Sequence, residues 1–509
     1  MKKLSTLPTA IIIGIFLFAL AFRLSGLFNN HPFWVDEFSS AAQAKLLLKY
    51  GLGVFTNPNL YFESNNIVTH AIIALSFVLF GFHEWAARIP FAIIGSMVPV
   101  LVYFLGKKIS DTWVGVGAAM LTATSYFMIV WSRQARGYML LIALILAGIY
   151  VYIRVLEKSD TRKIILFVTL CLLGVATHTS YVLLIASFGL HFVLTKYSIA
   201  EKIVKKPQTY IAIAVMAAIA FFVGLPSNIY NAYTLGTLGA NNVWYYHSFL
   251  WREYPLITFL GAAGLATLLI QKKKYTFLLY FFAFHLIFFN FVFKPYNTRY
   301  MLPLFPILFI GMAYLFSLVV QSVTKQRAWI LLPVCFIIAN GNKFDLKPNP
   351  YYSINHDFRE VALIDYDQIY SIIQTKGKLS EGKTAVIDTW WDRLRWYVGD
   401  DFGPIYAFRW ANSPGLINGL PKFTPYVMRN GEKVIPQSQG VRLVANLSDL
   451  NAVMNKYPRG FLFVDDESMP ADVIQYAKQH LKKELYLDRY PLDDNPLSLW
   501  PTTLYSWGL

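Results

Sequence analysis

The stretch Phe33–Glu37, with the sequence FWVDE, lies in the first polar gap of the chain. It follows an apolar segment from about Pro8 to Phe28, and about 20 apolar residues are enough to cross a bilayer. Two adjacent acids beside a tryptophan, at the mouth of a membrane-embedded protein, are costly to place near lipid and therefore indicate chemistry. The alternative is a solvated loop in which Asp36 and Glu37 have no role, and the rest of the sequence bears on this choice.

The composition is that of a polytopic membrane protein. Hydrophobic residues make up 56% of the 509 residues and charged residues only 15%, whereas about 45–50% apolar residues are usual in soluble domains. The net charge of +16 comes mostly from Lys and Arg in short clusters between apolar segments. Such clusters set membrane orientation, so they do not indicate a nucleic-acid partner. Cys171 and Cys335 lie inside apolar segments and predict neither a disulfide framework nor a metal site.

The basic clusters predict the topology of a multi-pass protein of the cell membrane. Lys2 and Lys3 precede the first apolar segment, which we expect to be retained as a helix with a cytoplasmic N-terminus. Two apolar segments separate each later cluster from the next, so every cluster can be cytoplasmic. These clusters are Lys107-Lys108, Arg154 to Lys163, Lys196 to Lys206, Lys272 to Lys274, and Lys325 with Arg327.

One apolar segment, Ile67–Phe82, does not fit this alternation. A crossing here would place all later basic clusters outside, so we expect the segment to lie in, or re-enter, the outer leaflet. The chain then has roughly eleven crossings, or twelve apolar segments when this one is included. The external side receives Asp36 together with Ser132–Tyr138, the turn Thr177–Thr179, the loop Pro226–Arg252 and the segment Lys294–Tyr300.

Two soluble parts are also predicted. Ser39 to Tyr50 has the pattern of a short amphipathic helix that ends at Gly51, with Lys45 and Lys49 four residues apart on one face. After about Asn340 the content of Pro, Asp, Asn and Gly rises, which divides the chain into a transmembrane domain, residues 1–340, and an extracytoplasmic domain, residues 341–509. Strands are expected at 384–388, 441–446 and 460–464, with a helix capped by Ser448 and another over 470–483.

These strands and helices alternate, which predicts a small α/β domain. The domain has no Gly-rich phosphate loop, so we expect no nucleotide site in it.

Several motifs, taken in order, resemble a known family. They are Trp34-x-Asp36-Glu37, Tyr61-Phe62-Glu63, the segment Leu79–Arg88, the segment Ser132–Tyr138, and Arg299-Tyr300-x-x-Pro303. Their order and spacing over about Leu4 to Phe316 are similar to those of the GT-C membrane glycosyltransferases. Within these, the chain is most similar to the protein O-mannosyltransferase and aminoarabinose (lipid A) transferase group.

This resemblance implies a sugar donor linked to polyprenyl phosphate and a lipid, glycan or protein acceptor on the external face. It assigns the acid of the first loop to Asp36. It also assigns a metal-site acid to Glu63, with His247 as a candidate second ligand of a divalent metal. The sequence departs from the aminoarabinose enzymes in two places, because Ser64-Asn65 replaces Lys-Pro and the acid of the second loop is replaced around Arg136 to Tyr138.

The residue types suit this chemistry independently of the resemblance. Displacement of a polyprenyl phosphate, which inverts the anomeric carbon, needs a base for the acceptor proton and cations for the departing phosphate. Asp36 is the candidate base, with Glu37 beside it. The candidate phosphate ligands are Arg133, Arg136 and Arg299, for which the alternative is anchoring to lipid headgroups. Glu63, His178 and Tyr138 are candidates for contacts with the substrate or a metal; a lone His in a helical bundle is otherwise a hydrogen-bonding partner.

Two other classes of protein remain as alternatives. A transporter or flippase of lipid-linked sugars predicts charges near the bilayer midplane and broken helices in two similar halves, whereas here the charges gather at one surface. A sensor with an external domain is the other alternative. Such a sensor would not need a Trp-x-Asp-Glu loop on the same side of the membrane as three external arginines. The sequence therefore predicts an integral membrane glycosyltransferase.

Overall fold

The computed structural model describes residues 6–58, 60, 62–158, 160–195, 238–358, 360–399, 405–411, 416–417, 420–421, 424–436, 438–465, 469–493, 495 and 498–509. The chain forms two compact units. The helical unit comprises Met1–Phe28 and Ser64–Tyr352, and the sheet unit comprises Asn29–Glu63 and Ser353–Leu509. The loop that carries Asp36 therefore belongs to the same unit as the C-terminal region. The domain limits 1–340 and 341–509 stay a prediction. Three of the predicted features lie outside the described residues: Tyr61, the Lys196–Lys206 cluster and residues 226–237 of the external loop.

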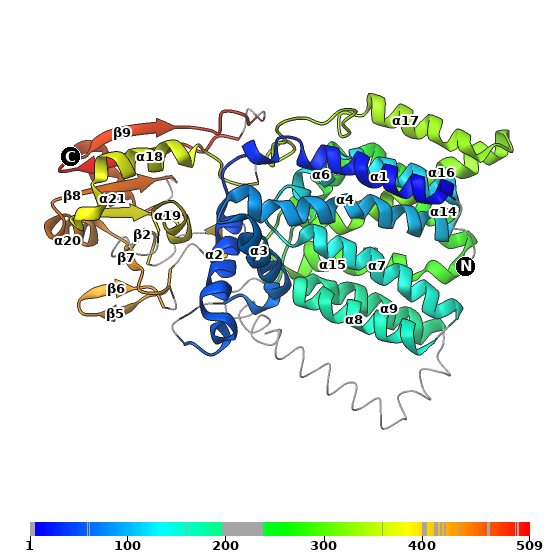
Figure 1. The fold of residues 1–509 in the computed structure, drawn as a ribbon, viewed down its shortest axis with the longest axis horizontal. Coiled ribbons are helices and arrows are strands. Elements are labelled where there is room, and N and C mark those ends of the chain that lie inside the picture. The colour runs from blue at the N-terminus through cyan, green and yellow to red at the C-terminus, as the bar shows by residue number, and fades with distance from the viewer. Residues whose placement is uncertain are drawn as a thin grey trace, which may run out of the picture. The chain divides into compact units, whose positions relative to one another are not determined.

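Long apolar helices build the helical unit (Figure 1). In the described part of the chain, five helical stretches are long and apolar enough to span a membrane, and a sixth results if Val243–Glu253 and Pro255–Gln271, bent by 97°, form one span. The predicted number of eleven or twelve stays a prediction, because residues 196–237 are not described. The helices are α1 (Thr6–Leu24), α3 (Ile67–Phe80), α4 (Glu84–Ile109), α5 (Thr112–Thr124), α6 (Tyr126–Ser132), α7 (Tyr138–Glu157), α8 (Thr161–Thr177), α9 (Val182–Thr195), α13 (Val243–Ser248), α14 (Pro255–Gln271), α15 (Phe277–Ile287), α16 (Phe305–Val323) and α17 (Leu331–Asn340).

Helix α3 is the segment that did not fit the predicted alternation. Its 14 residues reach about 21 Å, against the roughly 30 Å of a bilayer core. The helix alone is thus too short to cross, and the expectation that the segment lies in or re-enters the outer leaflet stays a prediction.

Glycines set the closest helix contacts in the helical unit. A Cβ added to Gly264 of α14 would lie 1.8 Å from the carbonyl oxygen of Gly311 of α16. A Cβ added to Gly106 of α4 would lie 2.9 Å from the Cα of Gly115 of α5. Small residues at such crossings allow backbones to approach, which is how helices pack where lipid removes the hydrophobic driving force.

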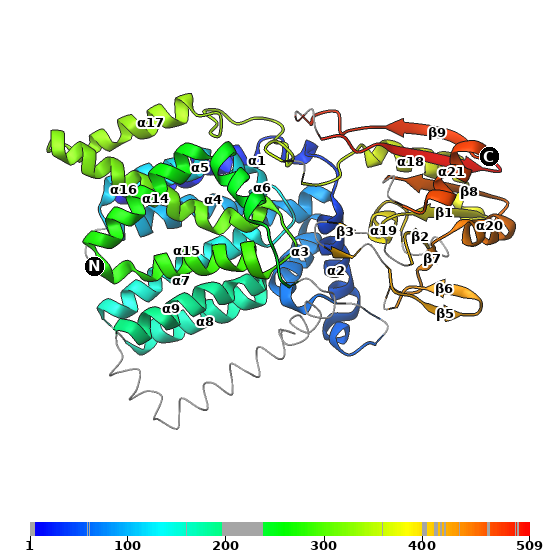
Figure 2. The same ribbon diagram turned by 180° about the vertical axis from the view of Figure 1, so that it is seen from behind.

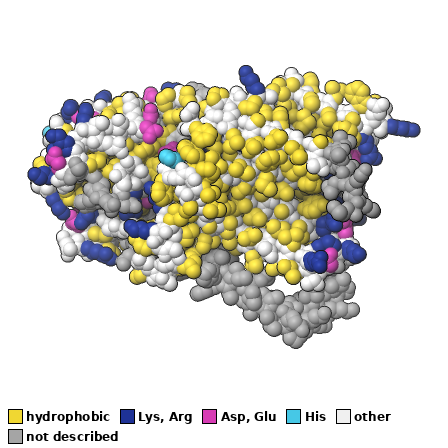
Figure 3. Space-filling model, in the orientation of Figure 1, with side chains coloured by type: hydrophobic (Ala, Val, Ile, Leu, Met, Phe, Trp, Pro, Cys, Tyr) yellow, Lys and Arg dark blue, Asp and Glu magenta, His cyan; other side chains and the backbone are white. Residues whose placement is uncertain are grey.

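Several basic clusters meet at one end of the helical unit, as the predicted topology requires. Lys108 pairs with Glu157 at 2.6 Å, and Lys274 lies 3.9 Å from the same carboxylate. Arg327 pairs with Asp111 at 3.0 Å. Figure 3 shows Lys and Arg gathered at the end of this unit near the N-terminus, with hydrophobic side chains over most of its visible face. The clusters that are distant in sequence therefore share one polar end.

The sheet unit is built on an eight-stranded sheet of order β5-β6-β7-β2-β1-β8-β10-β9 (Figure 2). Its centre is parallel: β1 pairs with β2 and β8, and β2 pairs with β7. The outer pairings are antiparallel. The strands are β1 (Thr384–Asp388), β2 (Tyr406–Phe408), β5 (Val427–Arg429), β6 (Glu432–Val434), β7 (Arg442–Val444), β8 (Arg459–Val464), β9 (Lys482–Leu487) and β10 (Thr502–Trp507), with a separate pair β3 (Leu416–Ile417) and β4 (Leu420–Pro421).

Helices pack on both faces of this sheet. Leu462 and Val464 of β8 join a buried cluster with Leu450 of α20 and Val473 of α21. Phe463, between them, points to the other face because strand side chains alternate, and its ring lies 6.4 Å from that of Tyr370 in α18. The unit is thus an α/β sandwich of three layers. Its helices are α18 (Tyr366–Gly377), α19 (Trp391–Val398), α20 (Leu447–Lys456), α21 (Ala471–His480) and, from the first loop, α2 (Val35–Tyr50).

The structure confirms the predicted strands and corrects the helix ends. Strand β1 has the predicted limits, and β7 and β8 agree within a few residues. Helix α20 is capped by Asn446, whose side chain accepts from the N–H of Asp449, and not by Ser448. Helix α21 ends at His480 rather than near 483, because Lys482 already belongs to β9 and pairs with Ser506 of β10.

Candidate active site

Helix α2 places the FWVDE stretch in the sheet unit. The helix ends at Tyr50, as predicted, where the N–H of Gly51 (φ 53°) donates to the carbonyl of Leu47. It begins at Val35, four residues before the expected start, so Asp36 and Glu37 lie in its first turn. Carboxylates are favoured there because the N-terminus of a helix carries a partial positive charge.

Aromatic contacts hold α2 against the C-terminal part of the same unit. The ring of Phe33 lies 5.0 Å from that of Trp396, and the ring of Phe38 lies 6.0 Å from that of Tyr397. Both Phe33 and Phe38 are buried. These contacts explain why a loop between two apolar segments folds with residues more than 300 positions later.

A cavity of about 400 Å³ lies beside α2, a volume typical of small-molecule sites. Asp36 and Glu63 both line it, whereas Glu37 is fully buried and does not. The remaining lining comes from α2, from α19 with the residue before it, and from the segment before β7. These residues are Val35, Phe38, Ser39, Ala42, Gln43, Lys45, Leu46, Lys49, Trp390, Trp391, Asp392, Arg395, Trp396, Pro436, Ser438 and Gln439.

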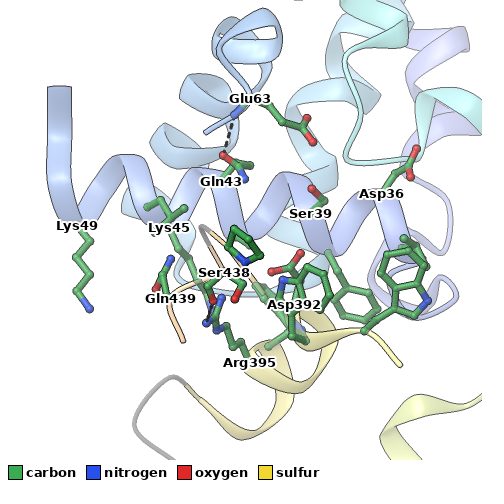
Figure 4. A pocket seen from close by; sticks show the side chains of 18 residues that line it. Asp36, Ser39, Gln43, Lys45, Lys49, Glu63, Asp392, Arg395, Ser438 and Gln439 are labelled. Carbon is green, nitrogen blue, oxygen red and sulfur yellow. Dashed lines mark hydrogen bonds between the residues drawn. The ribbon is translucent and has the colours of Figure 1, made fainter. Parts of the chain in front are cut away.

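Two carboxylates lie on one side of α2 in this cavity. Asp36, Ser39 and Gln43 recur at three and four residues and so share a side of the helix. The backbone N–H of Glu63 donates to Oε1 of Gln43 at 3.2 Å, which brings Glu63 to the same side. Figure 4 shows Asp36, Ser39 and Glu63 together on that side. The arrangement places two acids at the edge of a cavity large enough for a substrate group.

A buried ionic cluster fixes α19, which forms the opposite wall. Arg393 is 1% exposed and contacts Asp388, at the end of β1, and Asp465, just after β8. Its Nη2 lies 3.1 Å from Oδ2 of Asp465 and donates to Oγ1 of Thr389 at 2.9 Å. Burial alone would lower the pKa of Arg393, but the neighbouring carboxylates raise this pKa well above its ordinary value.

The position of this cluster in the sheet follows a general rule. In the sheet, β1 lies between β2 and β8. The chain passes from β1 to β2 on one side and returns to β8 on the other side, so β1 and β8 flank a topological switch point. Open α/β sheets place binding sites at the carboxyl ends of strands at such points. Helix α19 leaves this point, and its first residues line the cavity.

In the helical unit, Arg299 lies among aromatic rings, one of which belongs to the predicted residue Tyr138. The guanidinium of Arg299 lies 5.6 Å from the ring centroids of Tyr138 and Tyr300 and 5.8 Å from that of Trp131. The ring of Tyr138 lies 5.6 Å from that of His178. Such cation–aromatic contacts help to hold a guanidinium in place.

Arg136 belongs electrostatically to the same group. His178 lies in the turn after α8, outside the candidate spans, where burial lowers its pKa and the positive charges of Arg136 and then Arg299 lower it further. Tyr138 begins α7 and Glu157 ends it, so this group and the basic end are separated by about 30 Å, the thickness of a bilayer core. The structure thus places the predicted external group and the predicted cytoplasmic clusters at opposite ends of the unit.

Arg133 has a different setting from the other two arginines. It is 1% exposed, and its Nη1 and Nη2 donate to the carbonyls of Ser25 at 2.6 Å and Pro350 at 3.2 Å. Its guanidinium also lies 5.0 Å from the ring centroid of Tyr352. These contacts hold three chain segments together, and the phosphate role of Arg133 stays a prediction.

The predicted metal ligands do not form a recognisable metal site. Across the described residues, no group of three or more His, Cys, Asp and Glu side chains is placed to hold a metal ion. Glu63 lies in the sheet unit, and His247, in the helical unit, is exposed with its ring 6.1 Å from that of Trp251. The roles of Glu63 and His247 as metal ligands therefore stay a prediction.

The wall formed by α19 was not predicted from the sequence. A signal was present, since three tryptophans, two arginines and an aspartate follow strand 384–388 within eight residues, from Thr389 to Trp396. Of these residues, Trp390, Trp391, Asp392, Arg395 and Trp396 line the cavity.

Comparisons with known proteins agree with this architecture. The family model described as dolichyl-phosphate-mannose-protein mannosyltransferase matches residues 64–226. No curated protein sequence matches the chain. With the solved structures below, these findings show that the chain has the GT-C fold of membrane glycosyltransferases.

Two groups of solved structures share this fold at low identity. ArnT from Cupriavidus metallidurans bound to undecaprenyl phosphate is 13% identical, with a TM-score of 0.51 over 98% of this chain and 97% of that chain. The oligosaccharyltransferase AglB from Archaeoglobus fulgidus, in complex with an inhibitory peptide and a dolichol-phosphate, is 12% identical, with a TM-score of 0.51 over 97% of this chain and 76% of that chain. The similarity therefore extends through both units.

Proposed function

We propose that this protein is an integral membrane glycosyltransferase that moves a sugar from a polyprenyl-phosphate-linked donor to an acceptor on the extracytoplasmic face. The observation that carries the proposal is the position of Asp36, which lines a cavity on the same side of α2 as Glu63. The fold supports the reaction class. The solved structures with undecaprenyl phosphate and dolichol-phosphate support the class of donor.

In the proposed reaction, an acceptor hydroxyl attacks the anomeric carbon of the donor sugar. The new bond joins the acceptor oxygen to this carbon, while the bond from the carbon to the phosphate oxygen breaks and its electron pair leaves with the polyprenyl phosphate. Asp36 accepts the proton of the acceptor hydroxyl. Attack opposite the leaving group inverts the anomeric configuration. Glu37, fully buried one residue further on, acts only by positioning α2.

The departing phosphate needs cations to stabilise its charge. Arg299, held by aromatic rings, and Arg136, close enough to influence His178, are the proposed ligands. A guanidinium matches two phosphate oxygens at once, which stabilises the charge that develops as the bond breaks. Tyr138 and His178 hold this group in place.

The proposed orientation follows from the two ends of the helical unit. The end with the joined basic clusters is cytoplasmic by the positive-inside rule. The end with Arg136 and Arg299, the first loop and the C-terminal residues are then extracytoplasmic. The enzyme acts in the cell membrane on an acceptor that is a lipid, a glycan or a protein.

The test is sugar transfer from a polyprenyl-phosphate donor in membranes that contain matched amounts of each variant. Asp36→Asn keeps the shape of the side chain but cannot accept the proton, so we expect normal insertion, retained donor binding and a rate loss of roughly 10²–10⁴-fold. Glu37→Gln is the matched control and should cost less. Near-normal transfer by Asp36→Asn would remove the base role, and equal losses at both positions would mean that the pair acts as one electrostatic unit.

A further inference from the structure

Buried polar side chains hold the backbone on both sides of Arg299. We call residues 293–300 the Arg299 segment, which joins the helix α15 to the run of helix that becomes α16. The side chains that contact its backbone include His285, Asn242, Tyr246 and Asn297, each at most 5% exposed. Polar groups buried this deeply in a membrane protein are costly, so they indicate a role in function or in fixing one conformation.

His285 of α15 contacts the residue that follows Arg299. Its Nε2 lies 2.5 Å from the carbonyl oxygen of Tyr300, and because a carbonyl only accepts, Nε2 carries the proton. The ring of Phe289 stacks on the ring of Tyr300, with centroids 4.8 Å apart. The ring of Tyr300 in turn lies 5.6 Å from the guanidinium of Arg299. His285 and Phe289 thus fix the backbone and the ring of a residue that packs against Arg299.

Asn242, just before α13, fixes the other end of the Arg299 segment. Residues Phe288–Val292 form a π-helical turn, in which the N–H of Phe293 donates to the carbonyl five residues earlier at 2.9 Å. Such turns are rare and are frequent at functional sites. Nδ2 of Asn242 donates to the carbonyls of Phe293 at 2.9 Å and Lys294 at 3.0 Å. Asn242 therefore satisfies carbonyls that the ending helix leaves unpaired, and holds the chain where it leaves α15.

Asn297 fixes the backbone of Arg299 itself. It precedes the 3₁₀ helix Thr298–Leu304, and its side chain accepts from the N–H of Arg299 at 3.2 Å. Its own N–H donates to the hydroxyl of Tyr246 in α13 at 3.4 Å. A cap of this kind satisfies an N–H that the helix leaves unpaired, so it keeps Arg299 in the first turn. The Arg299 segment is thus held before, at and after Arg299.

We propose that His285 and Asn242 are positioning residues that act through Arg299: they hold the segment that carries it, so that its guanidinium meets the departing phosphate. A guanidinium binds two phosphate oxygens only in a defined orientation, and a displacement of about 1 Å in such an arrangement can cost about 100-fold in rate. Buried hydrogen bonds from helices supply this precision. The inference rests on the proposed function and adds two residues to which the sequence assigned no role.

The experiment measures the affinity of the purified full-length protein for undecaprenyl phosphate in detergent. His285→Phe keeps an aromatic ring but removes the N–H, which leaves the carbonyl of Tyr300 unpaired, so binding should weaken about tenfold. His285→Gln is the conservative variant. Its amide N–H reaches about the position of Nε2–H, so its affinity should stay within about threefold of that of the unmodified protein.

The matched control removes a different buried histidine of the helical unit. His191 is 2% exposed, and its Nδ1 is hydrogen-bonded to the hydroxyl of Tyr152 at 2.8 Å. Its ring lies 5.4 Å from that of Phe277, which is about 12 Å along α15 from His285. His191→Phe should therefore lower the melting temperature and leave the affinity for undecaprenyl phosphate unchanged.

A double-mutant cycle tests whether His285 acts through Arg299. In an Arg299→Lys background, His285→Phe should weaken binding by less than about twofold, because the guanidinium that His285 positions is already gone. A purely structural role would give the same loss in both backgrounds. Asn242→Ala gives an independent comparison from the other end of the Arg299 segment, and decides the question if His285→Phe does not fold.

Three results would overturn the inference. They are an unchanged affinity in both His285→Phe and Asn242→Ala, an equal loss in the two backgrounds, and a loss in His285→Gln as large as that in His285→Phe. Unchanged affinity in Arg299→Lys would overturn the inference together with the phosphate role of Arg299. Asp36→Asn separates the two proposals, because it should lower transfer yet keep the affinity for undecaprenyl phosphate. Normal transfer by that variant would refute the base role and leave the positioning role standing.

Discussion

Removal of Arg393 should destabilise the sheet unit more than any change at its surface. Arg393 is 1% exposed and contacts Asp388 (0% exposed) and Asp465 (4% exposed). Arg393→Ala leaves both buried carboxylates without their cation, and breaking one buried pair costs about 3–5 kcal/mol. We expect this loss because both carboxylates are buried and cannot move into water while the sheet unit stays folded.

The assay is amide hydrogen exchange of β1 and β8 in the detergent-purified full chain. A loss of about 3–5 kcal/mol corresponds to roughly two to four orders of magnitude in protection, at 1.36 kcal/mol for each factor of ten. Lys456→Ala, which removes a half-exposed partner of Glu432, is the control and should cost about 1 kcal/mol or less. Protection in Arg393→Ala within tenfold of the unmodified protein would refute the assignment of the cluster as an essential clamp.

The pH dependence of the same variant gives a second readout. Burial already raises the pKa of Asp465 in the folded protein, and Arg393 opposes this shift. Without Arg393 the folded-state pKa rises further above its unfolded value near 3.9, so the folded state binds more protons in the window above that value. Stability of the variant should therefore fall as the pH rises from about 5 to 8. An equal deficit at both pH values would contradict this account.

Three further predictions concern the helical unit and the orientation of the chain. Arg299→Lys keeps the charge but loses the bidentate contact with phosphate, so donor binding should weaken by about 1.5–3 kcal/mol. Binding is measured with polyprenyl phosphate in detergent, and an unchanged affinity would leave Arg299 as a lipid anchor. Gly264→Leu should separate α14 from α16, because even a Cβ would lie 1.8 Å from a backbone oxygen. This change should lower the melting temperature of the purified protein. Gly14→Leu, with open space around its Cβ, is the control and should leave the melting temperature unchanged. A reporter fused after Leu509 should signal an extracytoplasmic location, and a cytoplasmic signal would overturn the proposed topology.

The sequence anticipated much of the local structure in the sheet unit. The strand at Thr384–Asp388 was predicted with its observed limits, because a short apolar run between polar residues specifies a buried strand. The end of α2 at Gly51 was predicted because glycine adopts a positive φ without strain. The helix limits near 447 and 480 were less accurate, since caps and strand starts depend on neighbours that the local pattern does not contain.

Apolar segments and charge clusters along the chain were sufficient by themselves to predict a multi-pass helical protein with a small α/β part, because bilayer thickness and the cost of buried charge act on short segments. The order of motifs was sufficient to suggest Asp36 and Arg299. Only the tertiary structure decided that Asp36 shares a cavity with Trp391 and Arg395, and that Arg133 holds carbonyls of Ser25 and Pro350. These pairings join residues separated by more than 100 positions, and such contacts follow from the packing of whole elements, which no local pattern of hydrophobicity or charge records.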